Sequence, residues 1–190
     1  MAKPTIVLYP GAGTACDHPS LVHIEATMTP SAHVERRDFP YRREGRRAPD
    51  RAPKLMASMR DDLAAFGRRR GPVVLGGRSM GGRMCSMLAA DVDGEGPVRR
   101  LAGLVLICYP LHPPKKPDKL RVEHLPGIEV PCLFVSGTRD PFGTPDELER
   151  WTSTIPARVE HEWIDGARHD LKGHDERIAE RVAHFVASLT

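Results

Sequence analysis

Six short apolar runs rich in β-branched residues recur along the chain and limit the folds open to it more than any other feature. Their sequences are TIVLYP, HVERRDF, PVVLGG, LAGLVLICYP, VPCLFVSG and RVEHEWID. Several are continuously apolar, which is typical of strands covered on both faces. Segments with helical periodicity lie between them. This alternation predicts an α/β fold: a mostly parallel sheet of about six strands, with right-handed crossovers and helices on both faces.

Four segments carry the signals of helices. In APKLMASMRDDLAAFGRRRG the apolar residues recur at steps of three and four, at Leu55, Met59, Leu63 and Phe66. Gly67 is expected to end that helix. SMGGRMCSMLAADV and TPDELERWTSTI are further candidates, the latter with Thr144 as N-cap and Pro145 at its first position. HDERIAERVAHFVASLT closes the chain with an apolar stripe at Ile178, Val182, Phe185 and Val186.

The length of 190 residues suits one domain over residues 1–190, with a substantial core. No apolar run approaches the roughly 20 residues that span a bilayer. The first run, TIVLY, is too short for the apolar part of a signal peptide and reads as a strand. We therefore expect a cytoplasmic protein that does not enter a membrane.

The four cysteines show no spacing typical of a metal site: they are Cys16, Cys85, Cys108 and Cys132. Cys108 and Cys132 lie in or beside apolar runs, where a free cysteine packs as a small hydrophobe. We expect neither disulfides nor structural zinc.

Arginine supplies most of the positive charge behind the net charge of +3. Arginines cluster in YRREGRR (41–47) and GRRRG (67–71). Such clusters can bind nucleic acid or another acidic partner, or they can be solvated, with Arg68 to Arg70 stabilising the end of a helix. The lack of interleaved aromatic residues favours solvated charge, and we expect no nucleic-acid partner.

The motif GGRSMGG ends the third apolar run and begins a helical segment. Residues 77–81 fit the pattern G-x-S-x-G, with Ser79 at the centre. In a nucleophile elbow the serine occupies a sharp, strained turn, and the flanking glycines avoid collisions with neighbouring elements. The following helix directs its first N–H groups at the site. A plain turn that packs a helix is the alternative, and Gly76 and Gly82 add weight to it.

Two further polar residues follow later strands. Asp140 follows the run VPCLFVSG, and His169 follows the last run in the loop DGARHDL. Asp140 before a proline can be simple turn chemistry, and His169 can be a surface histidine. However, the order Ser79, Asp140, His169 is that of α/β-hydrolases, and strand ends in a parallel sheet meet at one edge. The neighbouring Asp170 is expected to point elsewhere.

The glycine-rich segment YPGAGTACDHPS follows the first run and can aim a backbone N–H at an oxyanion. We assign the oxyanion donors to Ala12 and to Met80, the residue after the nucleophile. A dinucleotide-binding turn is the competing interpretation. GAGTAC lacks the third glycine of that pattern, and no clear ribose-binding acid follows the second run.

The motifs LYPGAG, GGRSMGGR, CYPLHPP, EHL, FVSGTRDPFG and GARHDL resemble small α/β-hydrolases of the dienelactone-hydrolase-like branch. Within it, the chain is similar to compact hydrolases related to a subunit of the chromatin-associated non-specific-lethal complex. The resemblance spans nearly the whole chain. It implies a compact hydrolase sheet reduced at its N-terminal edge, a triad of Ser79, Asp140 and His169, and no cofactor. The predicted site contains no metal.

Two departures from the family bear on the substrate. Dienelactone hydrolases proper have a cysteine nucleophile, whereas this elbow carries Ser79. The chain also has no cap domain, which usually shapes substrate choice in the family. The substrate of dienelactone hydrolase therefore does not transfer to this chain.

The irregular, proline-rich segment from Pro110 to Pro131 is expected to border the site, because long loops in compact domains are often functional. Candidates for contacting substrate are Tyr109, His112, Arg121 and His124. Equally, His124 and Arg121 can simply tie the loop down. If Arg78 and Arg121 face the pocket, they would favour an anionic group on the substrate.

The sequence thus predicts a serine hydrolase acting on a small ester or related acyl substrate. Two alternatives stay open: a hydrolase-like interaction protein without turnover, and an acyltransferase that uses the same triad. No residue pattern indicates an oligomeric state.

Overall fold

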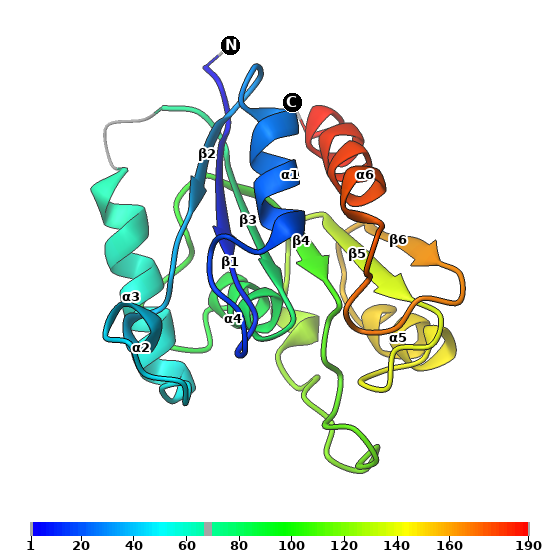
Figure 1. The fold of residues 1–190 in the computed structure, drawn as a ribbon. Helices are drawn as coiled ribbons and strands as arrows, with labels where there is room; N and C mark the ends of the chain where they lie inside the picture. The colour runs from blue at the N-terminus through cyan, green and yellow to red at the C-terminus, as the bar shows by residue number, and fades with distance from the viewer. Residues whose placement is uncertain (1, 67–69, 190) are drawn as a thin grey trace.

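The computed structural model describes residues 2–66 and 70–189, and these residues form one parallel sheet covered by helices (Figure 1). The strands lie in the order β2-β1-β3-β4-β5-β6. They are β1 (Thr5–Tyr9), β2 (His33–Arg36), β3 (Val73–Arg78), β4 (Leu101–Ile107), β5 (Cys132–Gly137) and β6 (Val159–Ile164). Each lies within or overlaps a run identified in the sequence, and every neighbouring pair is parallel. The predicted α/β architecture is confirmed.

Helices cover both faces of the sheet. They are α1 (Pro19–Met28), α2 (Pro40–Arg43), α3 (Ala52–Ala65), α4 (Met80–Ala89), α5 (Pro145–Thr152) and α6 (Asp175–Ala187), with a 3₁₀ turn η1 (Leu125–Gly127). Figure 1 shows α1 and α6 side by side on one face, and α3, α4 and α5 on the other. Because strand side chains alternate between the two faces of the sheet, the strands contribute side chains to two separate hydrophobic cores.

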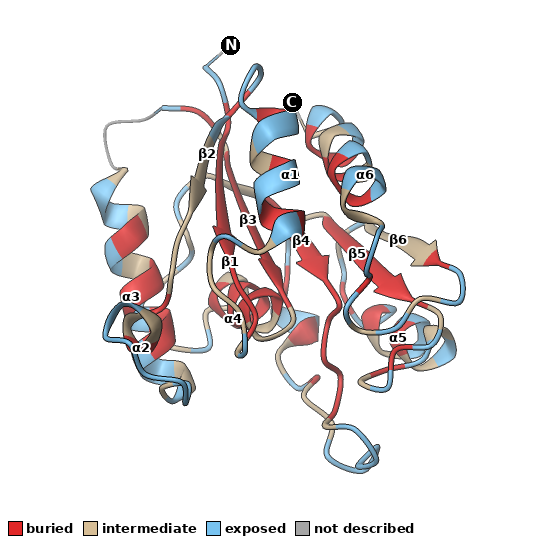
Figure 2. Cartoon of the chain, in the orientation of Figure 1, coloured by how far each residue is buried: buried red, intermediate tan, exposed pale blue. Residues whose placement is uncertain are grey.

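The two cores are continuous layers of buried apolar side chains. On β1, Ile6 and Leu8 pack in the layer beneath α1 and α6, whereas Val7 and Tyr9 pack in the layer with α3 and α4. Every residue of β1, β3 and β5 is buried, as the buried ribbons at the centre of Figure 2 show. The continuously apolar runs therefore reflect strands covered on both faces.

The predicted helices are found where the sequence has a clear apolar stripe or a clear N-cap residue. Thr144 caps α5 through a capping box with Glu147, and the predicted stripe of α6 is buried. In α3, Leu63 and Phe66 are only partly buried at the edge of the core. The helix is assigned as far as Ala65, and residues 67–69, with the predicted stop at Gly67 and Arg68 and Arg69 of the arginine cluster, lie outside the described residues.

Helix α1 was not predicted, although its sequence carries a signal. Pro19 occupies its first turn, and Leu21, Ile24 and Met28 are buried at helical spacing. The four cysteines are free, and Cys85, Cys108 and Cys132 are buried. Among the described residues, no helix combines the length and the hydropathy that crossing a membrane requires.

The segment between β4 and β5 is tied to α4 by a buried polar cluster. The ring of His124 lies 2.8 Å from Ser86 Oγ and 3.2 Å from the Tyr109 hydroxyl, both through Nε2. Tyr109 and Ser86 are themselves hydrogen-bonded at 3.2 Å. Burial raises the pKa of Tyr109 to about 12, so its hydroxyl stays neutral. The cluster anchors the loop that carries Arg121.

The titration of His124 is expected to make the protein less stable in acid. Burial, with the charge of Arg83, lowers the pKa of His124 to about 4 from an ordinary value of 6.5. The unfolded state therefore binds more protons between these values. The free energy of unfolding should fall as the pH drops from about 6.5 to about 4, by at most about 3 kcal/mol from this group. Urea unfolding between pH 8 and pH 4 measures this slope.

The variant His124→Asn should show a smaller fall in the free energy of unfolding between pH 6.5 and pH 4, because it lacks the titrating group. His33→Asn is the matched control, since the His33 side chain is exposed at the opposite end of the sheet. Equal slopes for the wild type and His124→Asn between pH 6.5 and pH 4.5 would contradict the assignment.

Candidate active site

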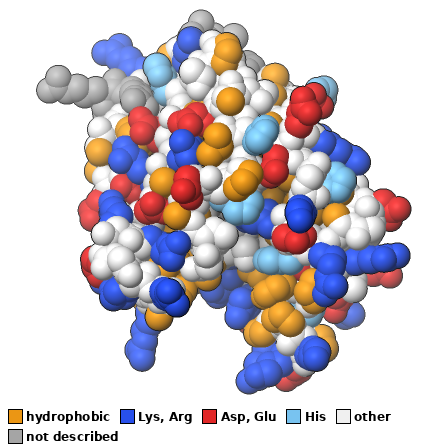
Figure 3. Space-filling model, in the orientation of Figure 1, with side chains coloured by type: hydrophobic (Ala, Val, Ile, Leu, Met, Phe, Trp, Pro, Cys, Tyr) orange, Lys and Arg blue, Asp and Glu red, His pale blue; other side chains and the backbone are white. Residues whose placement is uncertain are grey.

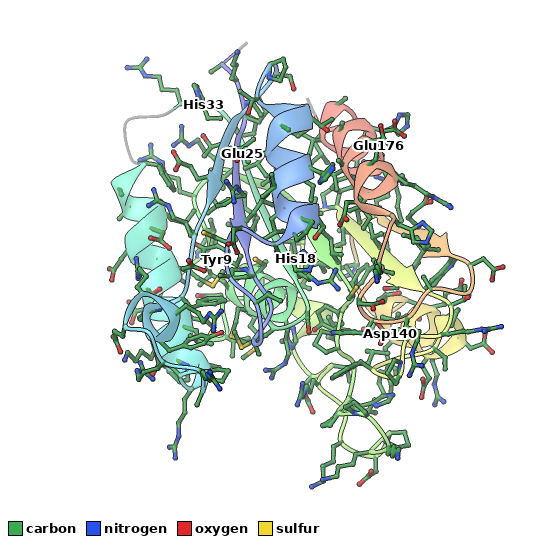
Figure 4. The ribbon with its side chains drawn as sticks, viewed as in Figure 1. Tyr9, His18, Glu25, His33, Asp140 and Glu176 are labelled. Carbon is green, nitrogen blue, oxygen red and sulfur yellow. The ribbon has the colours of Figure 1, made fainter. Side chains whose placement is uncertain are left out.

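A cavity of about 680 Å³ lies at the carboxyl ends of the strands, where parallel sheets commonly hold their ligands. Figure 4 shows His18 and Asp140 toward that end of the molecule, and His33 at the other. The lining residues come from the end of β3, the start of α4 and the loops after β1, β4, β5 and β6. Those that carry the argument below are Ala12, His18, Ser79, Arg83, Arg121 and His169.

Ser79 occupies a strained turn between β3 and α4. Its backbone has φ 49° and ψ −115°, a combination that costs a residue other than glycine about 1–3 kcal/mol. The Ser79 N–H donates to the carbonyl of Ile107 at 2.7 Å, which fixes the turn against β4. The turn presents the Ser79 side chain to the cavity at the start of α4. This is the strand–turn–helix context that the elbow motif requires.

The glycines of the motif allow β1, the end of β3 and the start of α4 to approach one another closely through their backbones. A Cβ on Gly81 would lie 2.4 Å from the carbonyl oxygen of Tyr9, and one on Gly77 would lie 2.5 Å from the backbone of Gly81. Both contacts are with backbone atoms, which cannot move aside as a flexible side chain can. The alternative of a simple helix-packing turn accounts for this closeness but not for the strain at Ser79.

Gly81→Ala is therefore expected to destabilise the protein by more than about 4 kcal/mol, because the added methyl group meets the backbone of Tyr9. Gly13→Ala is the matched control: a Cβ there meets nothing within 4 Å, so its effect should stay within about 0.5 kcal/mol. Thermal and urea unfolding of both variants measure the difference. Similar stabilities for the two would contradict the close packing of β1 on α4.

The structure brings Ser79, His169 and Asp140 into one hydrogen-bonded chain. His169 Nε2 lies 2.9 Å from Ser79 Oγ, and His169 Nδ1 lies 2.7 Å from Asp140 Oδ2. Asp140 is 4% exposed, whereas the imidazole of His169 keeps 22% of its surface open toward the cavity. The arrangement has the form of a nucleophile, a base and an orienting acid.

Neighbouring groups hold the acid and the histidine in place. The N–H of Phe142 donates to Asp140 Oδ1 at 2.9 Å, and the Phe142 ring stacks on His169 with centroids 4.1 Å apart. Arg78, only 5% exposed, donates from Nη2 to the backbone carbonyl of His169 at 2.6 Å. These contacts restrict the His169 loop and the orientation of its ring.

Cys108 lies beside Asp140 and His169, and its Sγ comes within 4.8 Å of their ligand atoms. These three side chains are the group among the described residues whose atoms come close enough to share a metal ion. Burial raises the pKa of the Cys108 thiol to about 12, so it stays protonated near neutral pH. Asp140 and His169 are already paired with each other. The donor set is a poor fit to a metal ion.

Both predicted oxyanion residues line the cavity beside Ser79. Within the described ranges, neither the N–H of Ala12 nor that of Met80 donates to another protein group. Met80 is the first residue of α4, where N–H groups have no partner inside the helix. The Tyr41 hydroxyl donates to the carbonyl of Ala12 at 2.9 Å and holds this residue in place.

Of the four residues expected to contact substrate, Arg121 lines the cavity and the other three do not. Tyr109 is 1% exposed and, with His124, forms the buried cluster on α4. His112 is buried, with Nδ1 at 2.9 Å from the carbonyl of Pro113 and Nε2 at 3.6 Å from Glu147. The prediction treated polar residues of one loop alike, but three of these side chains turn inward and fix the loop.

Other residues of the cavity were not predicted from the sequence or were predicted to lie elsewhere. Asp170 was expected to point elsewhere, but it lines the cavity. Arg83, His18 and Phe142 also line it and were not predicted. Arg83 stands four residues after Ser79, one helical turn away on the same face, and this spacing is a usable signal. His18 and Phe142 carry no comparable pattern.

Comparisons with known proteins identify the family and the fold. The family described as the alpha/beta hydrolase domain matches residues 2–187 of the chain. An α/β serine hydrolase homologue from Coxiella burnetii is 15% identical, with 98% of this chain and 86% of that chain covered at a TM-score of 0.77. A monoacylglycerol lipase from Paleococcus ferrophilus is also 15% identical, with coverages of 100% and 97% and a TM-score of 0.77. The RedJ thioesterase from Streptomyces coelicolor is 16% identical, with coverages of 100% and 86% and a TM-score of 0.74.

Proposed function

Because the chain belongs to the alpha/beta hydrolase domain family, we propose that it is a serine hydrolase that cleaves a small ester or related acyl substrate. The observation that carries the proposal is the chain of hydrogen bonds from Asp140 through His169 to Ser79, at 2.7 and 2.9 Å. The proposal assigns these residues as acid, base and nucleophile. The neighbours named as a lipase and a thioesterase support an acyl substrate.

The first half of the reaction forms an acyl-enzyme. His169 holds a proton on Nδ1, shared with Asp140, so Nε2 is free to accept the proton of Ser79. Ser79 Oγ then attacks the acyl carbonyl carbon, and the carbonyl oxygen becomes an oxyanion. The N–H groups of Met80 and Ala12 stabilise it, at roughly 3–4 kcal/mol for each donor. His169 gives its new proton to the leaving alcohol, and the bond to the leaving group breaks.

The second half releases the acid. His169 Nε2 accepts a proton from a water molecule while the water oxygen attacks the acyl carbon, and the same two N–H groups hold the second oxyanion. As this intermediate collapses, the proton returns from His169 to Ser79 Oγ. Asp140, held by the N–H of Phe142, keeps the imidazole in the tautomer that both steps need.

Three finer assignments go with this proposal. We assign the chain to the dienelactone-hydrolase-like branch on the motifs around Ser79, Asp140 and His169. We further propose that it is a single domain and that it acts in the cytoplasm. The three residues come from loops after different strands of one sheet, which supports a single domain.

The acyl-enzyme provides the test. The protein is mixed with 4-nitrophenyl butyrate, quenched early and digested with trypsin, which cuts after Arg78 and Arg83 and so releases Ser79 in the peptide SMGGR. We expect a burst of nitrophenol and one butyryl group on this peptide, whose only hydroxyl belongs to Ser79. Ser153→Ala, a change at an exposed serine, should behave like the wild type. No nitrophenol release and no acylated peptide from folded protein would refute the hydrolase proposal.

A further inference from the structure

The cavity beside Ser79 carries an excess of positive charge. Three arginines line it, together with His18 and His169, and the acidic residue among the lining side chains is Asp170. The arginines are Arg78, Arg83 and Arg121. Figure 3 shows Lys and Arg side chains prominent along the end of the molecule where the strands end. The exposed lysines of the loop after β4 are Lys115, Lys116 and Lys119.

The three arginines are not equivalent. Arg78 donates a hydrogen bond to the carbonyl of His169 and is nearly inaccessible to solvent. Its side chain therefore holds the His169 loop in place instead of contacting a ligand. Arg83 and Arg121 have neither an ion pair nor a side-chain hydrogen bond with any residue in the part of the chain described. The Nε of Arg83 is buried without a partner among the described residues, and so is Nη1 of Arg78, but only Arg78 has a second nitrogen that donates to the protein. A buried guanidinium nitrogen without a hydrogen-bond partner costs free energy, and an anion bound in the cavity can supply that partner.

The position of Arg83 aims its side chain back toward Ser79. The Arg83 N–H donates to the carbonyl of Ser79 at 3.0 Å, so the two residues are one helical turn apart. Long side chains on a helix lean toward its N-terminus, which here is the cavity end of α4. Arg121 approaches from the loop after β4 and lines the same cavity.

The charge of Arg83 is unfavourable in the protein alone. A cation in the first turns of α4 opposes the positive end of the helix dipole. Burial and the charge of Arg121 lower the pKa of Arg83, while Tyr109 and the exposed Glu123 act in the opposite direction. An anion at this place would satisfy the helix end and both guanidinium groups at once.

We propose that Arg83 and Arg121 bind an anionic oxygen group on the acyl substrate, a carboxylate or a phosphate, next to the scissile bond. Guanidinium groups match the geometry of both anions, and an Arg–oxyanion contact is favoured where water is partly excluded. The inference rests on the proposed hydrolase function and names its substrate class. The anionic ester is thus recognised by α4 and by the loop after β4, while the triad acts on its carbonyl.

A matched pair of substrates tests the proposal. Mono-4-nitrophenyl succinate and 4-nitrophenyl pentanoate share the leaving group and have acyl chains of similar size, and only the succinate carries a carboxylate. The wild type should prefer the succinate in kcat/KM. In Arg83→Met and Arg121→Met the ratio of the two kcat/KM values should fall about tenfold or more, because a hydrogen bond to a charged group is removed. Arg83→Lys should keep part of the ratio.

Arg43→Met is the control for net charge, because Arg43 is exposed on α2 and lies outside the cavity. Its ratio should match that of the wild type. A wild-type ratio near one, or a ratio that falls equally in Arg43→Met and Arg83→Met, would overturn the proposal.

Binding without turnover separates this inference from the hydrolase proposal. Inorganic phosphate and succinate are each added to the wild type and to Arg83→Met in thermal unfolding. A rise in Tm that is lost in Arg83→Met supports anion binding even if no ester is cleaved, in which case only the hydrolase function fails. The anion that acts at the lower concentration identifies carboxylate or phosphate as the preferred group. Equal Tm shifts in both proteins would overturn the anion site and leave the hydrolase proposal standing.

Discussion

Replacing Ser79 by alanine is expected to lower kcat/KM for a short-chain ester by about 10⁶-fold. The change removes the oxygen that forms the acyl-enzyme, whereas the N–H groups of Met80 and Ala12 stay in place. Residual hydrolysis above the rate in buffer should remain, because these groups still stabilise an oxyanion formed by direct attack of water. Steady-state hydrolysis of 4-nitrophenyl butyrate measures the loss.

The fold of Ser79→Ala should be intact, because the one hydrogen bond of Ser79 Oγ to another described residue is that to His169, at 2.9 Å. Circular dichroism and Tm provide this control. A folded Ser79→Ala protein with activity within tenfold of the wild type would show that the serine is not the nucleophile.

Asp140→Asn is expected to lower kcat by about 10⁴-fold with little change in structure. The asparagine amide can donate a hydrogen bond to Nδ1 of His169 where the carboxylate accepted one. That contact favours the tautomer with its proton on Nε2, which cannot accept the proton of Ser79. Steady-state kinetics with the same ester gives kcat, and an unchanged Tm separates the effect from unfolding.

Asp170→Asn is the matched control for Asp140→Asn. Asp170 lies next to His169 and lines the cavity, but its carboxylate is exposed and makes no hydrogen bond to His169 in the described structure. Its kcat should stay within about tenfold of the wild type. If Asp170→Asn lost more activity than Asp140→Asn, the acid of the triad would have been assigned to the wrong residue.

The sheet and the elbow could be predicted because local sequence determines them. The continuously apolar runs mark strands buried on both faces, and Gly77 and Gly81 stand where a Cβ would meet backbone. Asp140 and His169 could be placed near Ser79 for a topological reason, since all three follow strands that end at one edge. The hydrogen-bond distances between them then follow from tertiary packing that no pattern reports.

The parts that failed depend on the direction of individual side chains. Tyr109 and His124 share a loop with Arg121, yet they turn toward α4 and bond to Ser86, whereas Arg121 lines the cavity. A sequence gives no orientation for side chains in an irregular loop. Arg83 lies on a helix, where spacing from Ser79 does give an orientation, and it was the more predictable omission.

Labelling with a fluorophosphonate tests most directly the claim that Ser79 is an activated nucleophile. The wild type, Ser79→Ala and His169→Ala are treated together, and the label is located by mass spectrometry. We predict one label per chain in the wild type, on the peptide that begins at Ser79, and none in either variant. The loss in His169→Ala is decisive, because Ser79 is still present there and only its base is missing. A folded wild type that takes no label, or a His169→Ala protein labelled as fast as the wild type, would contradict the account.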